Sequence, residues 1–312
     1  MPKVLISDSM DVIAEKILLE NGIEVDVKTD FTIDELIKRI SLYDGLIVRS
    51  ATKVTKEIIE KAKNLKIIGR AGAGVDNINL DAAKVKNIIV MNTPGGNTNA
   101  TAEHTLALLL SLSRKIPKAN ETTHSGEWAK KILKGNEIKG KTIGIIGFGN
   151  VGQRFAEMCH ALGLKVIILS KSFENIKNNY PNYESMNLTQ LLEEADIISF
   201  HCKPSTDGSP IITSKEISIM KESAFILNTA RGNLVSEKDL SEAIKNKTIK
   251  GAAIDVFTDE PAKNNALFGL DNVILTPHIA ASTSEAQIIV AEMVANQFVD
   301  YFLRNKVKNI VI

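Results

Sequence analysis

The stretch that decides the fold is Thr142-Ile143-Gly144-Ile145-Ile146-Gly147-Phe148-Gly149-Asn150-Val151-Gly152-Gln153. An apolar, β-branched run enters a GxGxxG turn, and a helical pattern begins directly after it. In such a turn the first glycine permits the tight bend, the second lets a pyrophosphate approach the backbone, and the third lets helix and strand pack closely. The helix N-terminus adds N–H donors for the phosphates. In this context the motif predicts a dinucleotide site rather than a glycine-rich turn that holds nothing.

The glycine turn lies about 140 residues into the chain, and strands alternate with helical patterns on both sides of it. Before it, strands are predicted at 3–7, 23–27, 45–48 and 65–68, with helices at 11–21 and 33–40. Beyond it, strands are predicted at 165–169, 196–201, 224–229, 251–256 and 272–276, with helices at 188–194 and 237–245. This alternation is typical of parallel sheets that helices cover on both faces. The sequence therefore predicts an α/β protein with two such domains.

Composition and charge exclude several classes of protein. The chain is 44% hydrophobic and 24% charged, which suffices for two ordinary cores. Its net charge of +1 argues against a nucleic-acid-binding protein, which would carry a basic stripe. The longest apolar run, 106–112, is too short to span a membrane. Cys159 and Cys202 form no disulfide or metal-site pattern, which favours a reducing, cytoplasmic location and no bound metal.

Polar residues that follow the predicted strands are the candidates for a site, because ligands of open α/β sheets bind at the carboxyl ends of the strands. These residues are Arg231 after Thr229-Ala230, the run from Asp255 to Glu260, and His278 after Thr276-Pro277. His104 and His201 lie in no such motif, and we interpret both as structural.

Motifs along nearly the whole chain resemble those of the D-2-hydroxyacid dehydrogenases, and most closely those of the phosphoglycerate dehydrogenase branch. They lie at 47–52, 69–77, 91–94, 229–232, 255–261 and 277–283. The resemblance implies a doubly wound Rossmann domain at 96–283, inserted in a flavodoxin-like substrate domain made of 1–95 and 284–312, with the active site in the cleft. The chain stops at Ile312 without the regulatory domains of longer relatives, so we expect no feedback inhibition by serine through such a domain.

Three residues are the catalytic candidates. His278 is suited to take the proton of a 2-hydroxyl group while a hydride leaves the same carbon. Glu260 is expected to hydrogen-bond the imidazole and orient it, and Arg231 to bind the substrate carboxylate or carbonyl oxygen. Each residue alone is also compatible with an ordinary structural role. Their joint occurrence in the family's order favours catalysis.

The resemblance also implies a set of coenzyme-binding residues. They are Gly147, Gly149, Asn150, Val151, Gly152, Ser170, Lys171, Cys202, Thr229, Ala230, Asp255, His278 and Ala281. NAD-selective members carry an acid after the second Rossmann strand, where it accepts from the ribose hydroxyls. Here Ser170 and Lys171 stand in that place, which favours NADP(H) over NAD(H) unless Lys171 is only a solvated loop residue.

Substrate residues are expected in the first domain and near it. Arg49 and Arg70 follow buried strands, where a charged side chain must emerge towards water or an anion. The resemblance places them, with Lys130 or Lys131, at the substrate phosphate. The remaining candidates are Ser50, Ala73, Gly74, Asn97 and Arg231. In the loop at 71–74, small residues leave N–H groups open to a carboxylate, although a mere tight turn is the alternative.

The predicted function is hydride transfer between a nicotinamide coenzyme and a D-2-hydroxy acid, with 3-phospho-D-glycerate and 3-phosphohydroxypyruvate as the first choice. A glyoxylate or hydroxypyruvate reductase is the alternative within the family. A non-enzymatic, dinucleotide-sensing protein of the corepressor kind would not need Arg231, Glu260 and His278 together. The resemblance and the apolar helical pattern at 101–113 predict a homodimer that uses the segment from Thr98 to Trp128. Trp128 itself is interpreted as packing.

Overall fold

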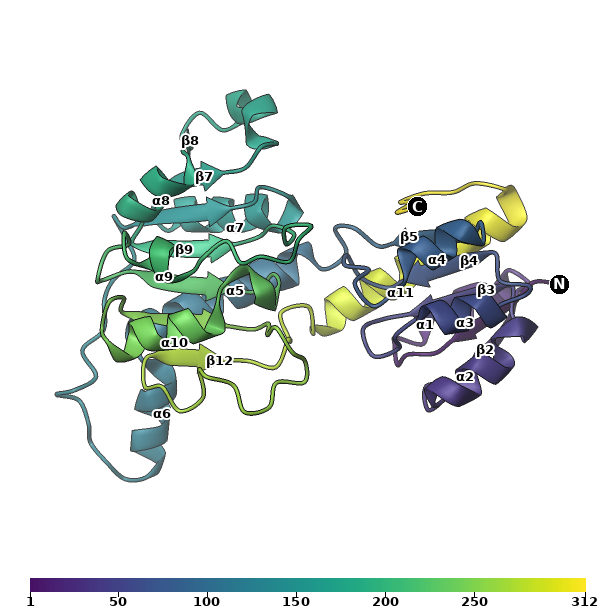
Figure 1. Cartoon of the computed structure of the whole chain (residues 1–312), viewed down its shortest axis with the longest axis horizontal. Coiled ribbons are helices and arrows are strands. Elements are labelled where there is room, and N and C mark those ends of the chain that lie inside the picture. Colours follow the sequence, from purple (N-terminus) through teal and green to yellow (C-terminus); the bar gives the residue numbers. More distant parts are fainter. The chain divides into compact units, whose positions relative to one another are not determined.

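The computed structural model describes residues 1–312 and divides into two compact units (Figure 1). Unit 1 consists of Met1–Asn97 and Ser282–Ile312, and unit 2 is the continuous segment Thr98–Ala281. The chain therefore passes from one unit to the other twice, after residue 97 and after residue 281. No helix is both long and apolar enough to cross a membrane.

Unit 1 is built on a parallel sheet of five strands in the order β2-β1-β3-β4-β5. This is the flavodoxin-like order, so that prediction is confirmed. Its strands are β1 (Lys3–Ile6), β2 (Glu24–Val27), β3 (Gly45–Val48), β4 (Ile67–Arg70) and β5 (Ile89–Asn92). Its helices are α1 (Ile13–Glu20), α2 (Ile33–Arg39), the 3-10 turn η1 (Ile40–Leu42), α3 (Lys56–Lys61), α4 (Leu80–Val85) and α11 (Ser284–Arg304).

Side chains that alternate along the strands bury the two faces of this sheet separately. Val4 and Ile6 pack with α1 and α11, whereas Leu5 packs with α2, α3 and α4 on the opposite face. The C-terminal helix fits closely, because a Cβ atom added to Gly45 or Gly69 would lie 2.7 or 2.5 Å from the ring of Phe298. The two glycines therefore make room in β3 and β4 for an aromatic ring of α11.

Unit 2 contains a parallel sheet of seven strands in the order β12-β11-β10-β9-β6-β7-β8. From β6 the order runs outward in both directions, which is the doubly wound arrangement predicted for a Rossmann domain. The strands are β6 (Thr142–Ile146), β7 (Lys165–Leu169), β8 (Glu184–Ser185), β9 (Ile197–Phe200), β10 (Phe225–Asn228), β11 (Gly251–Ile254) and β12 (Val273–Leu275). Side chains of α5 (Thr98–Arg114) and α7 (Asn150–Ala161) fill the core of one face.

Side chains of α8 (Leu188–Glu194), α9 (Ser214–Ile217) and α10 (Glu237–Lys245) fill the core of the other face. Short 3-10 turns follow two of the strands: η2 (Phe173–Asn175) and η3 (Lys177–Asn179) after β7, and η4 (Gly232–Leu234) after β10.

A segment of unit 2 projects from its body, namely α6 (Ile116–His124) and the chain that follows it towards β6 (Figure 1). The side chain of Trp128 in this segment is 85% exposed. The interpretation of Trp128 as a packing residue is therefore wrong for the single chain. Ile116 and Ile132 are also exposed, so the projection presents apolar side chains to water.

Candidate active site

The three glycines of the turn between β6 and α7 differ in the space around them. At Gly147 the backbone has a φ of +97°, and an added Cβ atom would lie 2.6 Å from the carbonyl of His201. At Gly152 an added Cβ atom would lie 2.2 Å from the carbonyl oxygen of Gly147. At Gly149 no atom lies within 4 Å of that position. The fold therefore requires glycine at positions 147 and 152. At Gly149 an added Cβ atom would meet no protein atom, so this position leaves open space next to the turn.

The open space at Gly149 lies at the N-terminus of α7. Gly149 is the N-cap residue and provides no side chain to cap the helix, and Asn150 and Val151 form the first turn. The helix end thus keeps N–H donors and the positive end of its dipole for an external anion. These features fit the pyrophosphate of a dinucleotide.

Ser170 and Lys171 follow β7 at the position where a coenzyme ribose is expected. The Ser170 and Ser172 hydroxyl groups lie 3.0 Å apart, and Lys171 is exposed. Aromatic contacts hold the segment that follows them. The ring of Phe148, in the glycine turn, packs edge-on against the rings of Phe173 and Tyr180, with centroid distances of 4.9 and 5.0 Å. Neither Ser170, Lys171 nor Ser172, the three residues directly after β7, is acidic.

Two residues after β9 lie against the glycine turn. The backbone nitrogen of Cys202 would be 2.7 Å from a Cβ atom at Gly147. Burial raises the pKa of the Cys202 thiol to about 11, so the thiol is neutral near pH 7. His201 is hydrogen-bonded to Ser199 at 2.8 Å, and burial lowers the pKa of its imidazole to about 3. A neutral His201 that is bonded to Ser199 is compatible with its structural interpretation.

The turn after β10 carries Arg231. The Asn228 side chain braces this turn, since it accepts from the Ala230 N–H at 3.1 Å and donates to the Arg231 carbonyl at 2.8 Å. Gly232 allows a close approach, because an added Cβ atom there would lie 1.9 Å from the carbonyl carbon of Phe257. The turn with Arg231 is thereby packed directly against the backbone that leads to Glu260.

His278 and Glu260 are in direct contact. The Nδ1 atom of His278 lies 2.7 Å from Oε2 of Glu260, and Oε1 of Glu260 accepts from the Phe257 N–H at 3.0 Å. Burial raises the pKa of Glu260, but the hydrogen bonds from His278 and Phe257 outweigh it and hold that pKa below its usual value. An ionised carboxylate only accepts, so Nδ1 carries the proton and Nε2 of a neutral His278 is left as a base.

The backbone of His278 is in the left-handed region, with φ at 54°, which is rare for a residue other than glycine. The buried Asp255 holds it there. The Asp255 carbonyl accepts from the His278 N–H at 2.8 Å, and its carboxylate accepts from the N–H groups of Ile279 and Ala280 at 2.9 Å each. Asp255 therefore shapes the loop, and its predicted contact with the coenzyme stays a prediction.

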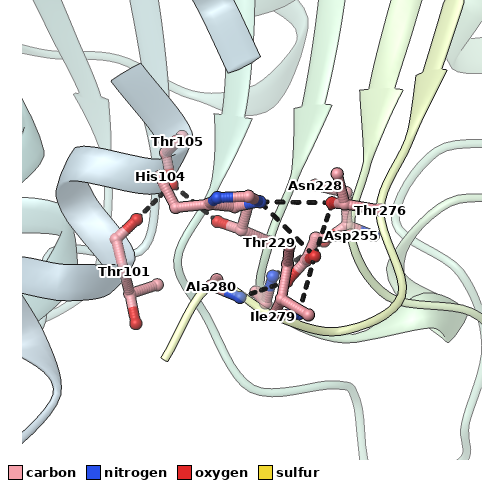
Figure 2. A network of polar contacts seen from close by, with 10 residues as sticks. Thr101, His104, Thr105, Asn228, Thr229, Asp255, Thr276, Ile279 and Ala280 are labelled. Carbon is pink, nitrogen blue, oxygen red and sulfur yellow. Dashed lines mark hydrogen bonds and ion pairs between the residues drawn. The ribbon is translucent and has the colours of Figure 1, made fainter. Parts of the chain in front are cut away.

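His104, interpreted from the sequence as structural, joins this network. Nε2 of His104, on α5, lies 3.1 Å from the Thr276 hydroxyl and 3.4 Å from the Asp255 carboxylate (Figure 2). The next residue of α5, Thr105, has its hydroxyl 2.8 Å from that of Thr229. The only sign of this contact in the sequence is the histidine itself. Its partner Thr276 lies 172 residues away, so no local pattern could connect the two.

In unit 1, the candidate substrate arginines stand on adjacent strands. Arg70 is the last residue of β4 and pairs with Val48 of β3, which Arg49 follows. Asp8 accepts from the Arg49 N–H at 2.6 Å and from the Thr52 hydroxyl at 2.5 Å, and thereby shapes the loop that carries Ser50. Both arginines are thus placed at one edge of the sheet.

The guanidinium of Arg70 lies against the loop at 71–74. An added Cβ atom at Gly72 would fall 1.4 Å from Nη1 of Arg70, and the backbone there has a φ of +143°. The Gly72 N–H donates to the Thr93 hydroxyl at 2.6 Å, and the Ala73 carbonyl accepts from the Asn92 amide. Gly72 therefore does not offer its N–H to a substrate, and the following Ala73 and Gly74 are the remaining donors of this loop.

The remaining candidates are Lys130, Lys131, Asn97 and Ala281. Lys130 and Lys131 are exposed in the projecting segment of unit 2. Asn97 is the last residue of the first part of unit 1, and Ala281 is the last of unit 2. No group of three histidine, cysteine, aspartate or glutamate side chains is placed to hold a metal ion.

Comparison with known proteins agrees with this geometry. Residues 106–280 match the family model of the D-isomer specific 2-hydroxyacid dehydrogenase, NAD binding domain. The chain belongs to the D-2-hydroxyacid dehydrogenase family. Among its relatives is the D-3-phosphoglycerate dehydrogenase of Methanocaldococcus jannaschii, 43% identical over 312 residues. The match covers 100% of this chain and 59% of that longer protein.

Two solved structures are similar over nearly the whole chain. One is an acyclic imino acid reductase in complex with NADPH and D-Arg, with 35% identity, a TM-score of 0.89 and coverage of 99% of this chain and 100% of that chain. The other is the NAD⁺-bound 3-phosphoglycerate dehydrogenase of Entamoeba histolytica, with 30% identity, a TM-score of 0.83 and coverage of 100% and 98%. One of these two structures thus holds NADPH and the other NAD⁺.

Proposed function

We propose that the protein is a nicotinamide-dependent dehydrogenase of D-2-hydroxy acids, with 3-phospho-D-glycerate and 3-phosphohydroxypyruvate as its substrate pair. The observation that carries the proposal is the hydrogen bond of 2.7 Å between His278 and Glu260. A dinucleotide-sensing protein of the corepressor kind needs the glycine turn but no base with an orienting carboxylate. The names of the relatives support the choice of substrate.

The residues of unit 2 have separate tasks in the proposed reaction. A nicotinamide coenzyme, when bound, accepts the hydride from C2 of the hydroxy acid or returns it to the oxo acid. Nε2 of His278 takes the proton of the 2-hydroxyl group, and returns it in the reverse direction. The Glu260 carboxylate stabilises the imidazolium that forms. Arg231 binds the carboxylate or the oxygen on C2 and polarises that bond during reduction.

The residues of unit 1 provide for the anionic groups of the substrate. Arg49 and Arg70, at the ends of adjacent strands, suit a phosphate dianion, because a strongly hydrated ion needs more than one cation to offset its desolvation. We also assign Lys130 or Lys131 to this phosphate, as the family resemblance implies. Ser50, Asn97 and the Ala73-Gly74 backbone complete the proposed substrate set.

A kinetic panel tests the proposal. The purified protein is assayed with phosphohydroxypyruvate, hydroxypyruvate and glyoxylate, each with NADH and NADPH. We expect the highest kcat/KM for phosphohydroxypyruvate. A preference for glyoxylate or hydroxypyruvate would replace the proposal with the reductase alternative. A further assay of these 2-oxo acids with ammonia covers imine reduction, since one structural relative is named an imino acid reductase. Coenzyme binding without any turnover would favour the sensing protein.

The Arg70→Ala variant is expected to discriminate between substrates. Loss of one charge-assisted hydrogen bond should lower kcat/KM for phosphohydroxypyruvate by an amount that corresponds to about 1.5–3 kcal/mol of transition-state stabilisation. Hydroxypyruvate lacks the phosphate and serves as the matched control, so its kcat/KM should hardly change. Equal losses for the two substrates would mean that Arg70 is structural or holds the carboxylate that they share.

For the coenzyme we propose a preference for NADP(H), based on Ser170 and Lys171 after β7 and on the absence of an acid there. The Lys171→Ala variant should weaken NADPH binding about tenfold, the effect expected for one exposed charge-assisted contact. NADH binding should stay unchanged because NADH has no 2′-phosphate. Both dissociation constants are measured by fluorescence titration, and equal dissociation constants of the wild-type protein for the two coenzymes would contradict the preference.

We also propose a homodimer in which the segment from Thr98 to Trp128 meets a second copy. The exposed Trp128, Ile116 and Ile132 on the projecting part of unit 2 support this, because apolar side chains gathered on one projection favour an interface. Light scattering at micromolar concentration should give about twice the chain mass of 34.0 kDa. The Trp128→Ser variant should shift the equilibrium towards monomer, and a monomeric wild-type protein would refute the proposal.

We also propose a cytoplasmic location, because the sequence shows no disulfide pattern. Both cysteines are free in the structure, and no helix can cross a membrane. Fractionation of cells that produce the protein tests this directly.

A further inference from the structure

The polar network at the ends of β10, β11 and β12 includes one side chain that the proposed mechanism does not use. Figure 2 shows His104 of α5 directed at Thr276 and Asp255. Its Nε2 atom lies 3.1 Å from the Thr276 hydroxyl oxygen and 3.4 Å from Oδ1 of Asp255. Only this atom of the imidazole contacts the network.

Proton counting decides the direction of this hydrogen bond. The Thr276 hydroxyl donates its single proton to Oδ1 of Asp255 at 2.5 Å. That hydroxyl is therefore left as an acceptor towards His104, and an ionised Asp255 also only accepts. Nε2 of His104 must carry a proton and donate. The chain of donation thus runs from His104 through Thr276 to Asp255.

Asp255 in turn holds the residues that follow His278. Its two carboxylate oxygens accept from the N–H groups of Ile279 and Ala280, and its carbonyl accepts from the N–H of His278. These bonds fix a positive-φ backbone at His278, a conformation that persists only when its surroundings enforce it. The Asp255 carboxylate is fully buried, so only protein groups can donate hydrogen bonds to it. The loss of any one donor should therefore destabilise the carboxylate and the loop that it holds.

We propose that His104 is a positioning residue, whose Nε2–H orients Thr276 and Asp255 so that the loop keeps His278 at the angle needed for proton transfer. The catalytic consequence rests on the proposed dehydrogenase function, whereas the effect on the loop does not. The His104 network also ties α5, which begins where the chain enters unit 2, to the residues just before the chain leaves it. One buried carboxylate thereby anchors both ends of unit 2.

Two nearly isosteric variants separate donation from packing. Gln in place of His104 keeps an N–H donor near the position of Nε2, whereas Met fills a similar volume without a donor. Hydrogen exchange of the amides at 278–280 is followed by mass spectrometry or NMR. We expect His104→Met to accelerate exchange at Ile279 and Ala280 about tenfold, and His104→Gln to keep the protection of the wild-type protein. The His160→Met variant, at an exposed site on α7, is the control.

The same variants are assayed with the best substrate of the wild-type protein. We expect His104→Met to lower kcat about tenfold without a change in the KM of the oxo acid, and His104→Gln to restore most of the loss. Thr276→Val should lower kcat similarly, and the double variant His104→Met/Thr276→Val should lose no more than either single one, because both break the same path.

Unchanged amide protection and kcat in His104→Met, or equal damage in His104→Gln, would overturn the inference and leave a packing role. If the wild-type protein reduces no 2-oxo acid, the proposed function fails, but the exchange data on the two variants still decide whether His104 holds the loop.

Discussion

The His278→Ala variant is expected to lose about 10²–10⁴-fold in kcat, the usual effect of removing a positioned acid–base group. The imidazole is the only group in the Glu260 cluster with a free basic nitrogen, so no neighbour can replace it. The backbone bonds from Asp255 do not involve the side chain, and the loop should therefore keep its shape. Stopped assays with single turnovers measure the chemical step, and fluorescence titration measures coenzyme binding, which should stay within a few-fold of the wild-type protein.

A second variant tests the orienting carboxylate. Glu260→Gln keeps the size of the side chain, but its amide can also donate to Nδ1, which would leave the wrong nitrogen of His278 protonated. We expect a smaller loss of kcat than for His278→Ala. His160→Ala is the control for a histidine outside the site. Near-normal turnover of His278→Ala would remove this residue from the mechanism.

Gly152→Ala is expected to lower stability, whereas Gly149→Ala is expected to weaken coenzyme binding without a loss of stability. At Gly152 the new Cβ atom meets the backbone oxygen of Gly147, which cannot move aside cheaply, so the free energy of unfolding should fall by about 1–3 kcal/mol. At Gly149 the backbone is extended and the space is open, so the free energy of unfolding should stay unchanged. The added methyl group would instead occupy the place of the pyrophosphate and weaken coenzyme binding at least tenfold.

Denaturant unfolding and calorimetric titration of the two variants separate these effects. The Gly149→Ala variant is the sharper test, because its new methyl group meets no protein atom and the native fold should be retained. Coenzyme binding by Gly149→Ala with the affinity of the wild-type protein would show that the dinucleotide does not use this turn.

Local sequence patterns predicted most of the strands and the parallel arrangement of both sheets. The runs at 45–48 and 142–146, for example, are short, continuous and apolar, which is typical of strands buried on both faces of a parallel sheet. β5 and the short helices α3 and α4 were not predicted as elements. Six-residue helices such as Lys56–Lys61 show less than two turns of any period and depend on tertiary packing for their stability.

The candidate site was predictable where residues stand directly after strands, as Arg231 and His278 do. The roles of Asp8 and His104 were not, since their partners lie 41–44 and 172 residues away in the sequence. The error at Trp128 has a different cause. A large aromatic residue is usually buried, but local composition does not reveal whether its own chain covers it.

The ring of Phe298 is synthesised long after the sheet of unit 1 that it covers. The ribosome synthesises β3 and β4 about 250 and 230 residues earlier, and between them and α11 it synthesises the whole of unit 2. Since unit 2 is one continuous segment, it can fold while the face of the first sheet above Gly45 and Gly69 still lacks its cover. A nascent chain whose residues 1–281 have left the ribosome should therefore hold a folded unit 2 and an unfinished first sheet, which is exposed to chaperones and proteases until α11 emerges.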